Sequence, residues 1–410
     1  MRYKTIDNYK VLNNENHSII VNLNNKSWLK VNSKYLDAIL ELVNKSEDIT
    51  KKISEIENEK IKSNLETLLK ELINLNIVVD ENKVHICNSD ELHVVSFSVT
   101  NRCNMKCSHC CSGSGYDYID ELSTDDLKNI IIKLSEINPD SIDITGGEPL
   151  LRNDILQVLE FARKNYNGKI LLSTNGTLIN EKNIKKICEN VDHISISLDG
   201  YDEESTKLIR GENIFKKVIS TVNKLKENEF KSISLSMLLH DNTYHNKHKF
   251  EELCESLEVQ PLLRVFTPIS RGWDIRSYVD NTLSESIQET AKYAQCSECK
   301  PAKRELSVDY NGNVYPCQLL HEDDLCFGNI KDQENILKEI IEEKNINDVF
   351  TKLNNIKVYN TQDCKDCNVN AFCGHCVSTY QSYKKDSELF ELYCKSYKDT
   401  LTESLWGNSF

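Results

Sequence analysis

The amino-acid sequence predicts an α/β protein in three parts, with a partial (β/α)6 barrel at its centre. The first observation is an alternation of strand and helix patterns that repeats through residues 91–285. The second is a mixture of a hairpin and helical patterns in residues 1–90, and the third is the end of the alternation, with clustered cysteines, in residues 286–410. At 410 residues the chain is long enough for two or three domains, each with its own core.

Residues 1–90 predict a small winged-helix-like module. The apolar runs 18-SIIVNL-23 and 27-SWLKV-31 flank Asn24, Asn25 and Lys26, an arrangement typical of a hairpin. Helical patterns follow, and a short strand, 77-IVVD-80, closes the module. The helical patterns are 33-SKYLDAILELVN-44, 49-ITKKISEI-56 and 60-KIKSNLETLLKELINLN-76.

The central part predicts a TIM-like arrangement of parallel strands, each followed by a helix. The strand patterns are 92-LHVVSFSV-99, 141-SIDIT-145, 169-KILLST-174, 193-HISISL-198, 231-KSISLSML-238 and 259-VQPLLRVF-266. The helical patterns between them are 123-STDDLKNIIIKLSEI-137, 152-RNDILQVLEFARKN-165, 180-NEKNIKKICEN-190, 212-ENIFKKVISTVNKLKEN-228 and 245-HNKHKFEELCESL-257. In such a barrel the active site lies at the carboxyl ends of the strands.

Composition limits the partners and the compartment. The formal net charge of −14 disfavours a long basic groove, so we expect no nucleic acid partner. The N-terminal stretch lacks the basic start and apolar run of a secretory signal, and no window reaches the length of a membrane helix, so we expect a cytoplasmic protein without a membrane partner. In a reducing compartment, clustered cysteines more often bind metal than form disulfides.

The first cysteine group lies where the first barrel strand ends. The spacing Cys103-x3-Cys107-x2-Cys110 supplies three thiolates from one compact loop, and three ligands leave one metal position open. The alternative is a structural zinc site with Cys111 as the fourth ligand. Adjacent Cys110 and Cys111 point in different directions and would chelate one metal poorly, which disfavours that alternative.

On these residues the sequence resembles the radical S-adenosylmethionine (SAM) superfamily. The resemblance implies that Cys103, Cys107 and Cys110 hold a [4Fe-4S] cluster whose fourth iron binds SAM. It also implies that the reduced cluster cleaves SAM to a 5′-deoxyadenosyl radical, which removes hydrogen from a substrate. The residue before the third cysteine, usually aromatic in the family, is His109 here.

Further stretches at the ends of strands fit the same resemblance. The segment 145-TGGEPLL-151 resembles the GGEP motif of the family; its glycines would let the backbone approach the ligand, and Glu148 could accept from the SAM amino group. The segment 268-PISRG-272 offers Arg271 as a weaker candidate. The residues expected to contact SAM are Gly146, Gly147, Glu148, Ser173, Asn175, Ser197, Asp199 and Arg210, the last by pairing with the SAM carboxylate.

The C-terminal cysteines resemble the SPASM extension of radical SAM enzymes, which carries two further [4Fe-4S] clusters and so implies three in all. The pattern is Cys299-x12-Gly312-x4-Cys317, then Cys364-x2-Cys367-x5-Cys373-x2-Cys376, then Cys394. The resemblance assigns Cys364, Cys367, Cys373 and Cys394 to an outer cluster. It assigns Cys299, Cys317 and Cys376 to an inner one, whose fourth iron is open to substrate or closed by Cys296 or Cys326.

Two departures from the SPASM pattern bear on these assignments. The gap between Cys373 and Cys376 is two residues where three are usual, which bears on how these two cysteines divide between the clusters. Gln318 follows Cys317 where the sulfatase-maturating members have an aspartate, which disfavours a sulfatase maturase. Two structural zinc sites, each closed by four thiolates, are the alternative for this region.

The resemblance implies a peptide-modifying enzyme, most like the sactipeptide and ranthipeptide maturases that form thioethers. Residues 1–90 resemble, in the order of their elements, the PqqD-like domain that binds the leader of a precursor peptide as an added strand, here at the Ser18 to Val31 hairpin. The expected partners are such a precursor and a reduced flavodoxin or ferredoxin-type electron donor. Two alternatives stay open: a carbon-carbon cross-link or other peptide modification, and a zinc-stabilised peptide-binding protein without redox activity.

Overall fold

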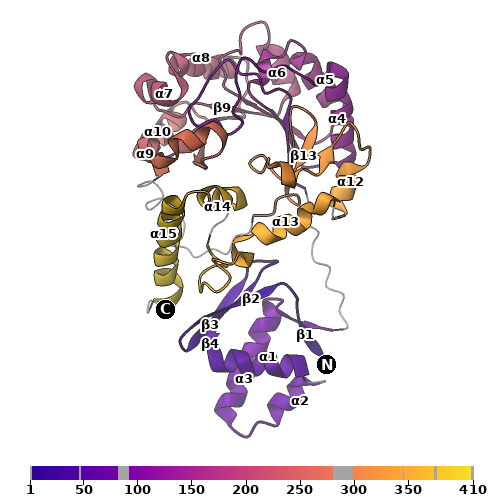
Figure 1. Cartoon of the computed structure of the whole chain (residues 1–410), viewed down its shortest axis with the longest axis vertical. Helices are drawn as coiled ribbons and strands as arrows, with labels where there is room; N and C mark the ends of the chain where they lie inside the picture. Colours follow the sequence, from indigo (N-terminus) through magenta and orange to yellow (C-terminus); the bar gives the residue numbers. More distant parts are fainter. Residues whose placement is uncertain are drawn as a thin grey trace.

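The computed structural model describes residues 2–45, 48–81, 92–279, 299–344, 346–373 and 376–407. Three parts follow one another along the longest axis of the molecule (Figure 1). The N-terminal helices and strands lie at one end, the parallel sheet with its helices lies at the other, and the C-terminal helices lie between them. The C-terminal region therefore separates the two units that precede it in the sequence.

The N-terminal unit consists of two small sheets and three helices. Its elements are β1 (Tyr3–Thr5), β2 (Tyr9–Asn14), β3 (His17–Asn22), β4 (Trp28–Asn32), α1 (Ser33–Lys45), α2 (Ile49–Ser54), α3 (Glu59–Asn74) and β5 (Val78–Asp80). Strands β2, β3 and β4 form an antiparallel sheet in that order, and β1 pairs antiparallel with β5. The hairpin and the three helices confirm the sequence-based expectation, whereas β1 and β2 were not expected. Lys10 and the two asparagines of β2 leave only two adjacent apolar residues, Val11 and Leu12, too few to predict a strand.

Both faces of β3 are buried, so this sheet is covered on two sides. Ile20 packs in the core formed with helices α1, α2 and α3. Ile19 and Val21 point to the other face and pack in a second core that includes Phe372 and Tyr380 of the C-terminal region. The N-terminal unit is therefore packed against the C-terminal region through the face of the sheet that the helices leave open.

The central sheet has nine strands in the order β11-β10-β9-β8-β7-β6-β12-β13-β14. Neighbouring strands from β11 to β12 run parallel, and β13 and β14 add antiparallel strands at the β12 side. The parallel strands are β6 (Val94–Ser98), β7 (Ser141–Thr145), β8 (Lys169–Thr174), β9 (His193–Ser197), β10 (Ile233–Leu239), β11 (Gln260–Val265) and β12 (Glu305–Val308). In this order β11 and β14 are the two edges, so the sheet is the partial barrel that the sequence predicts.

Helices connect the parallel strands on the outer side of the sheet (Figure 1). They are α4 (Thr124–Ile137), α5 (Ile155–Asn165), α6 (Ile184–Asn190), α7 (Glu203–Arg210), α8 (Ile214–Glu227), α9 (Asp241–Tyr244) and α10 (Lys247–Ser256). Two 3-10 helices, η1 (Pro149–Leu151) and η2 (Ser270–Val279), follow β7 and β11. Helix α7, between β9 and α8, was not among the helices that the sequence predicted. Asp202 caps its start by accepting from the Ser205 amide, and the sequence that follows contains only two apolar residues, Leu208 and Ile209, too few to predict a helix from their spacing.

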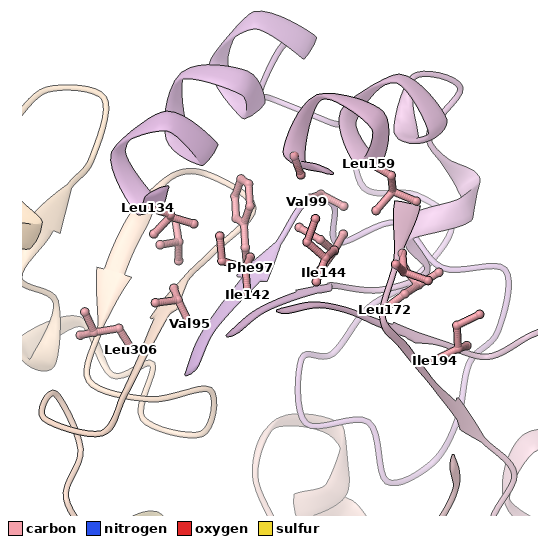
Figure 2. Packing of buried hydrophobic residues seen from close by; sticks show 14 of the residues in the cluster. Val95, Phe97, Val99, Leu134, Ile142, Ile144, Leu159, Leu172, Ile194 and Leu306 are labelled. Atoms are coloured by element: carbon pink, nitrogen blue, oxygen red, sulfur yellow. The ribbon is translucent and has the colours of Figure 1, made fainter. Parts of the chain in front are cut away.

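The sheet packs on its helices through alternate residues of each strand (Figure 2). Phe97, Ile142, Leu172 and Ile194 all belong to one buried core with residues of the covering helices, such as Leu134 and Leu159. The intervening positions carry polar side chains such as Asp143 and Ser195, and these face the inside of the barrel. The interior is therefore polar in the part of the chain that holds the candidate site.

The C-terminal region begins by extending the barrel sheet. Because β12 pairs parallel with β6, the first element described after residue 298 belongs to the same sheet as the barrel. The expected boundary at residues 285 and 286 lies outside the described residues, so it stays a prediction. The remaining elements are β13 (Asn313–Tyr315), η3 (Asp323–Leu325), β14 (Gly328–Asn329), α12 (Ile336–Ile341), η4 (Ile346–Asp348), α13 (Val349–Ile356), η5 (Val358–Asn360), α14 (Val377–Tyr383) and α15 (Ser387–Trp406).

Candidate active site

A cavity of about 400 Å³ opens at the carboxyl ends of the parallel strands. Its walls contain the three cysteines of the first group and most of the side chains expected to contact SAM. The expected residues that line it are Cys103, Cys107, Cys110, Gly146, Gly147, Ser173, Asn175, Ser197, Asp199 and Arg210. Residues from the ends of six strands thus meet at one place, as the sequence predicts for a barrel mouth.

The loop that carries the three cysteines is held by backbone contacts and by one arginine. The Cys103 amide donates to the Gly115 carbonyl at 2.9 Å, which closes the loop on itself. The guanidinium of Arg271 donates to the Cys107 carbonyl at 3.0 Å, to that of Gly113 at 2.9 Å and to that of Ser114 at 2.5 Å. Arg271 therefore holds the loop, a different role from the SAM contact considered for it from the sequence.

We expect Arg271→Ala to lower the amount of iron that the protein retains. Three hydrogen bonds from a charged donor would be lost, which should cost on the order of 3 kcal/mol or more in the stability of this loop. Iron per chain after anaerobic reconstitution and the thermal midpoint of the loaded protein measure the effect. Arg264→Ala is the matched control, because Arg264 lines the same cavity and makes no hydrogen bond to this loop among the described residues. Equal iron retention in both variants would contradict the role given to Arg271.

The donor set at this loop fits an iron-sulfur cluster. The pKa of the Cys103 thiol is raised to about 11, mainly by burial and in smaller part by the charges of Glu148, Cys107 and Cys110. The Cys107 thiol also has a raised pKa because of burial, and thiols that share one site need a positive centre to become thiolates together, which a cluster of iron ions supplies. At Cys107 the positive charge of Arg210 lowers the pKa of the thiol, against the larger effect of burial. Arg210 Nη1 lies 3.9 Å from the Cys107 sulfur.

The two glycines after β7 are required by the backbone of the cysteine loop. A Cβ at Gly146 would lie 2.2 Å from the Thr100 carbonyl oxygen, and one at Gly147 would lie 2.1 Å from the Arg102 carbonyl oxygen. The Gly147 amide donates to the Thr100 carbonyl at 2.8 Å across this contact. The sequence suggested that glycine permits close approach of a ligand; the structure shows close approach of the next loop.

Glu148 is fully buried and joins the ends of β7 and β8. Its Oε1 accepts from the Thr174 hydroxyl at 2.7 Å, and its Oε2 accepts from the Asn175 amide at 2.7 Å. Among the described residues, Glu148 does not line the cavity. Its contact with SAM therefore stays a prediction, while the structure gives it a clear role in placing Asn175.

Asp199, Arg210 and His109 form a buried group beside Cys107. Asp199 has a φ of 60°, and its Oδ2 accepts from Arg210 Nε at 2.6 Å while its Oδ1 accepts from the Leu238 amide at 2.6 Å. His109 Nε2 lies 3.4 Å from the same carboxylate, and burial lowers the pKa of His109 to about 4. The Asp199 carboxylate thus orients the Arg210 guanidinium toward the cavity, where it can pair with an anionic group.

Three other polar residues of this region were not assigned a role from the sequence. Arg264 and Gln318 line the cavity, and burial raises the pKa of Asp143, deeper in the barrel, to about 6. Ser173 lines the cavity, and its hydroxyl also donates to both Asp143 oxygens at 3.0 Å. The sequence does contain a signal for the position of Asp143. The residue lies between Ile142 and Ile144 in a strand, and because side chains of a strand alternate between its two faces, Asp143 is predicted to point into the barrel.

The four cysteines assigned to the outer cluster lie together. Cys364, Cys367 and Cys394 each raise the pKa of Cys373 by their charge, after burial as the main cause. Cys364, Cys367 and Cys373 pack against the core that contains Phe372 and Tyr380, and the Tyr380 hydroxyl is 3.6 Å from Cys364 Sγ. The charges of Cys364 and Cys367 also raise the pKa of Cys394, after burial as the main cause. The arrangement agrees with the expected grouping, in which Cys373 belongs with Cys364, Cys367 and Cys394.

Cys299, Cys317 and Cys376 form a separate group. The thiols of Cys299 and Cys376 are hydrogen-bonded, and the charge of Cys376 raises the pKa of Cys317, in addition to the larger effect of burial. Cys326 lies elsewhere, with its Sγ donating to the Gly328 carbonyl at 3.7 Å, and Cys296 falls outside the described residues.

The comparisons with known proteins agree with this geometry. Residues 97–256 match the radical SAM superfamily, and residues 296–368 match the iron-sulfur cluster-binding domain SPASM. The chain contains a radical SAM domain and a SPASM domain. The radical SAM domain binds a [4Fe-4S] cluster and SAM, and the SPASM domain binds additional iron-sulfur clusters. The assignment of particular cysteines to each cluster stays a prediction.

The relatives share this two-domain region at low sequence identity. Mycofactocin maturase MftC of Mycobacterium tuberculosis is 24% identical over 263 residues, which is 58% of this chain and 67% of that protein. The structure of anSMEcpe with bound AdoMet superposes with a TM-score of 0.56 at 20% identity, over 77% of this chain and 97% of that one. SuiB of Streptococcus suis bound to its precursor peptide SuiA superposes with a TM-score of 0.53 at 14% identity, over 94% and 97%. At these identities the structural likeness concerns the fold.

Membrane-spanning helices are absent from the part of the chain that the structure describes, since none of its helices combines the required length and apolar character.

Proposed function

We propose that this protein is a radical SAM enzyme that modifies a ribosomally synthesised precursor peptide by forming a thioether between a cysteine sulfur and a carbon atom. The observation that carries the proposal is one cavity that gathers Cys103, Cys107 and Cys110 with the polar side chains at the strand ends. The cluster and SAM, when bound, supply a radical that removes a hydrogen atom from a carbon. The chain's own residues decide what is held near that radical.

The residues around the cavity have distinct tasks in this proposal. Arg210, oriented by Asp199, pairs with the SAM carboxylate, and Asn175 and Ser197 offer hydrogen bonds to its polar groups. Arg271 and the Gly146–Gly147 segment keep the cysteine loop in place. Leu238, Val265 and Phe266 form the apolar part of the wall, against which an aliphatic or aromatic substrate side chain can pack.

The peptide substrate is supported by the N-terminal unit. Its antiparallel sheet ends at β2 and β4, and β4 is the strand of the expected hairpin that lies at an edge. An extended leader can add to such an edge by backbone hydrogen bonds. A PqqD-like role for residues 1–90, a cytoplasmic location and a flavodoxin or ferredoxin-type electron donor belong to the same proposal. The names of two relatives, a maturase and an enzyme bound to a precursor peptide, point the same way.

Co-expression with a small precursor encoded near its gene should give a peptide that has lost two hydrogens per link. A thioether also consumes a free thiol, so the modified cysteine should resist alkylation by iodoacetamide, whereas a carbon-carbon link would leave all thiols alkylatable. The matched control is co-expression with the Cys103/Cys107/Cys110→Ala variant, which should return unmodified peptide.

The leader provides a second comparison in the same experiment. We expect full-length precursor to be modified and the same core without its leader to be modified far less, because the leader supplies the binding energy. A mass loss with fully alkylatable cysteines would replace the thioether by a carbon-carbon product. Purified protein that holds zinc but neither iron nor sulfide would end the radical hypothesis.

A further inference from the structure

The floor of the cavity consists of hydroxyl side chains from the inner face of the sheet. Four neighbouring strands, β7 to β10, contribute to it, and the residues are Thr145, Ser173, Ser195 and Ser236. Alternation along β7 places Asp143 on the same face as Thr145, one layer deeper in the barrel. An ionisable carboxylate therefore lies beneath a floor of neutral hydroxyls.

Ser173 joins Asp143 to this floor. Its hydroxyl donates to both carboxylate oxygens of Asp143 at 3.0 Å. A serine hydroxyl has one hydrogen and two lone pairs, so a serine whose hydrogen is held by a carboxylate can only accept a hydrogen bond from the cavity. Ser195, opposite Ser173 on β9, makes no hydrogen bond to Asp143 among the described residues, and its hydroxyl can donate or accept.

The groups around Asp143 give it a carboxyl that titrates near neutral pH. The titratable side chains at inner positions of the parallel strands β6 to β12 are Asp143, Lys169, His193, Arg264 and Glu305. Of these, Arg264 acts on Asp143 and lowers its pKa, but burial has the larger effect and raises that pKa to about 6. Asp199 and Arg210, which follow β9, pair with each other. Asp143 is therefore ionised at pH 7.5 and mostly protonated at pH 5.

We propose that Asp143 is a positioning residue for SAM binding, because its ionised carboxylate keeps the Ser173 hydroxyl as an acceptor toward the cavity. SAM offers donors of the matching kind in its ammonium group and its ribose hydroxyls. The proposal rests on the proposed function in placing SAM against Ser173. It adds a chemical requirement, namely that the group of SAM held there donates a hydrogen bond.

Protonation of Asp143 reverses the hydrogen bond to Ser173. The carboxylic O–H then donates to Ser173 Oγ, and the hydrogen of Ser173 turns toward the cavity, where it meets a donor of SAM. SAM affinity should therefore fall as the pH falls through about 6. We expect the Kd for SAM to rise about fivefold to tenfold between pH 7.5 and pH 5, which is the effect of one hydrogen bond.

The test measures SAM binding and not turnover. Calorimetric titration of the full-length, iron-loaded protein with SAM, without a reductant, gives the Kd from pH 5 to pH 8. Asp143→Asn should remove the dependence on pH centred near 6, because an amide does not titrate. Ser173→Ala should remove the same dependence although Asp143 is still present, and should raise the Kd about fivefold to tenfold at pH 7.5.

Arg264→Gln tests the electrostatic part of the proposal. The positive charge of Arg264 lowers the pKa of Asp143, so its removal should move the midpoint of the pH dependence to higher pH. A midpoint that stays in place or moves to lower pH in this variant would contradict the assignment of the titration to Asp143.

Ser195→Ala is the matched control and should keep the pH dependence of the unmodified protein. The ammonium group of SAM also titrates, but its contribution is common to all variants. Iron content at each pH and circular dichroism show that each variant is loaded and folded. The proposal is overturned if Asp143→Asn or Ser173→Ala keeps the pH dependence, or if Ser195→Ala loses it.

Failure of the SAM site itself gives a different result. If SAM does not occupy this cavity, Arg210→Ala and Ser173→Ala should both leave the Kd of the unmodified protein unchanged at every pH. If Arg210→Ala weakens SAM binding while Ser173→Ala keeps the pH dependence, the site stands and the role of Asp143 is wrong.

Discussion

Replacing Cys103, Cys107 and Cys110 together by alanine should abolish reductive cleavage of SAM, lowering its rate by at least about a thousandfold, because no protein side chain can replace a redox-active cluster. Iron and sulfide should fall by about one third if three clusters are present. All three side chains line the cavity, and their thiols lie close enough to act on one another. Formation of 5′-deoxyadenosine under reducing, anaerobic conditions is the measurement.

Cys111→Ala provides the matched control for that experiment. Cys111 follows Cys110 directly, yet its side chain is exposed, and its sulfur lies 3.9 Å from the Ser112 hydroxyl. Removal of its thiol should therefore leave iron content and SAM cleavage near those of the unmodified protein. Normal cleavage in the triple variant, or equal losses in the triple variant and Cys111→Ala, would contradict the assignment of the first cluster.

Six of the seven parallel strands, β6 to β11, were predictable to within about two residues because their pattern is simple, whereas β12 was not predicted. Strands β7 and β8 begin and end where the sequence places them, since each combines buried alternate residues with a polar turn at its end. Helix α7 was missed because only Thr206 and Ile209 of its residues are buried. Local patterns therefore reveal elements that bury a continuous face and hide those that bury only two side chains.

The site was predictable where its residues belong to short motifs. Cys103, Gly146 and Arg210 come from recognisable segments after strands, and all three line the cavity. The role of Arg271 could not be predicted from motifs, because its guanidinium donates to three backbone carbonyls. A sequence does not show which backbone carbonyls a side chain will reach.

The N-terminal unit is bound to the cluster region more closely than the sequence indicated. Trp28 of β4 packs edge to face on Phe372 at 5.4 Å between ring centres, beside the residues of the outer cysteine group. Lys10 of β2 donates to the Tyr359 carbonyl at 3.3 Å, and the charges of Cys367 and Cys364 act on it. A peptide added at the edge of this sheet would therefore bind next to the C-terminal region, and not on a remote module.

Gly147→Ala should prevent the first cluster from forming while the rest of the protein still folds. The new Cβ would lie 2.1 Å from the Arg102 carbonyl oxygen, a separation that real Cβ atoms essentially never show, so the two loops must move apart. That movement would break the 2.8 Å hydrogen bonds from Gly147 N to Thr100 and from Glu148 N to Arg102, next to Cys103. We expect SAM cleavage to fall at least about a hundredfold, as for displacement of a catalytic group by about 1 Å.

Gly115→Ala is the control that separates this steric effect from a general effect of adding a methyl group to the site. Gly115 lies in the cysteine loop itself, but a Cβ there would meet its nearest atom, in the ring of Tyr118, at 4.0 Å, which is ordinary contact. This variant should keep its iron and its SAM cleavage. Both variants are compared by their iron content, the EPR signal of the reduced cluster and the formation of 5′-deoxyadenosine. Equal results for the two variants would show that the contact between the loops after β6 and β7 does not position the cluster.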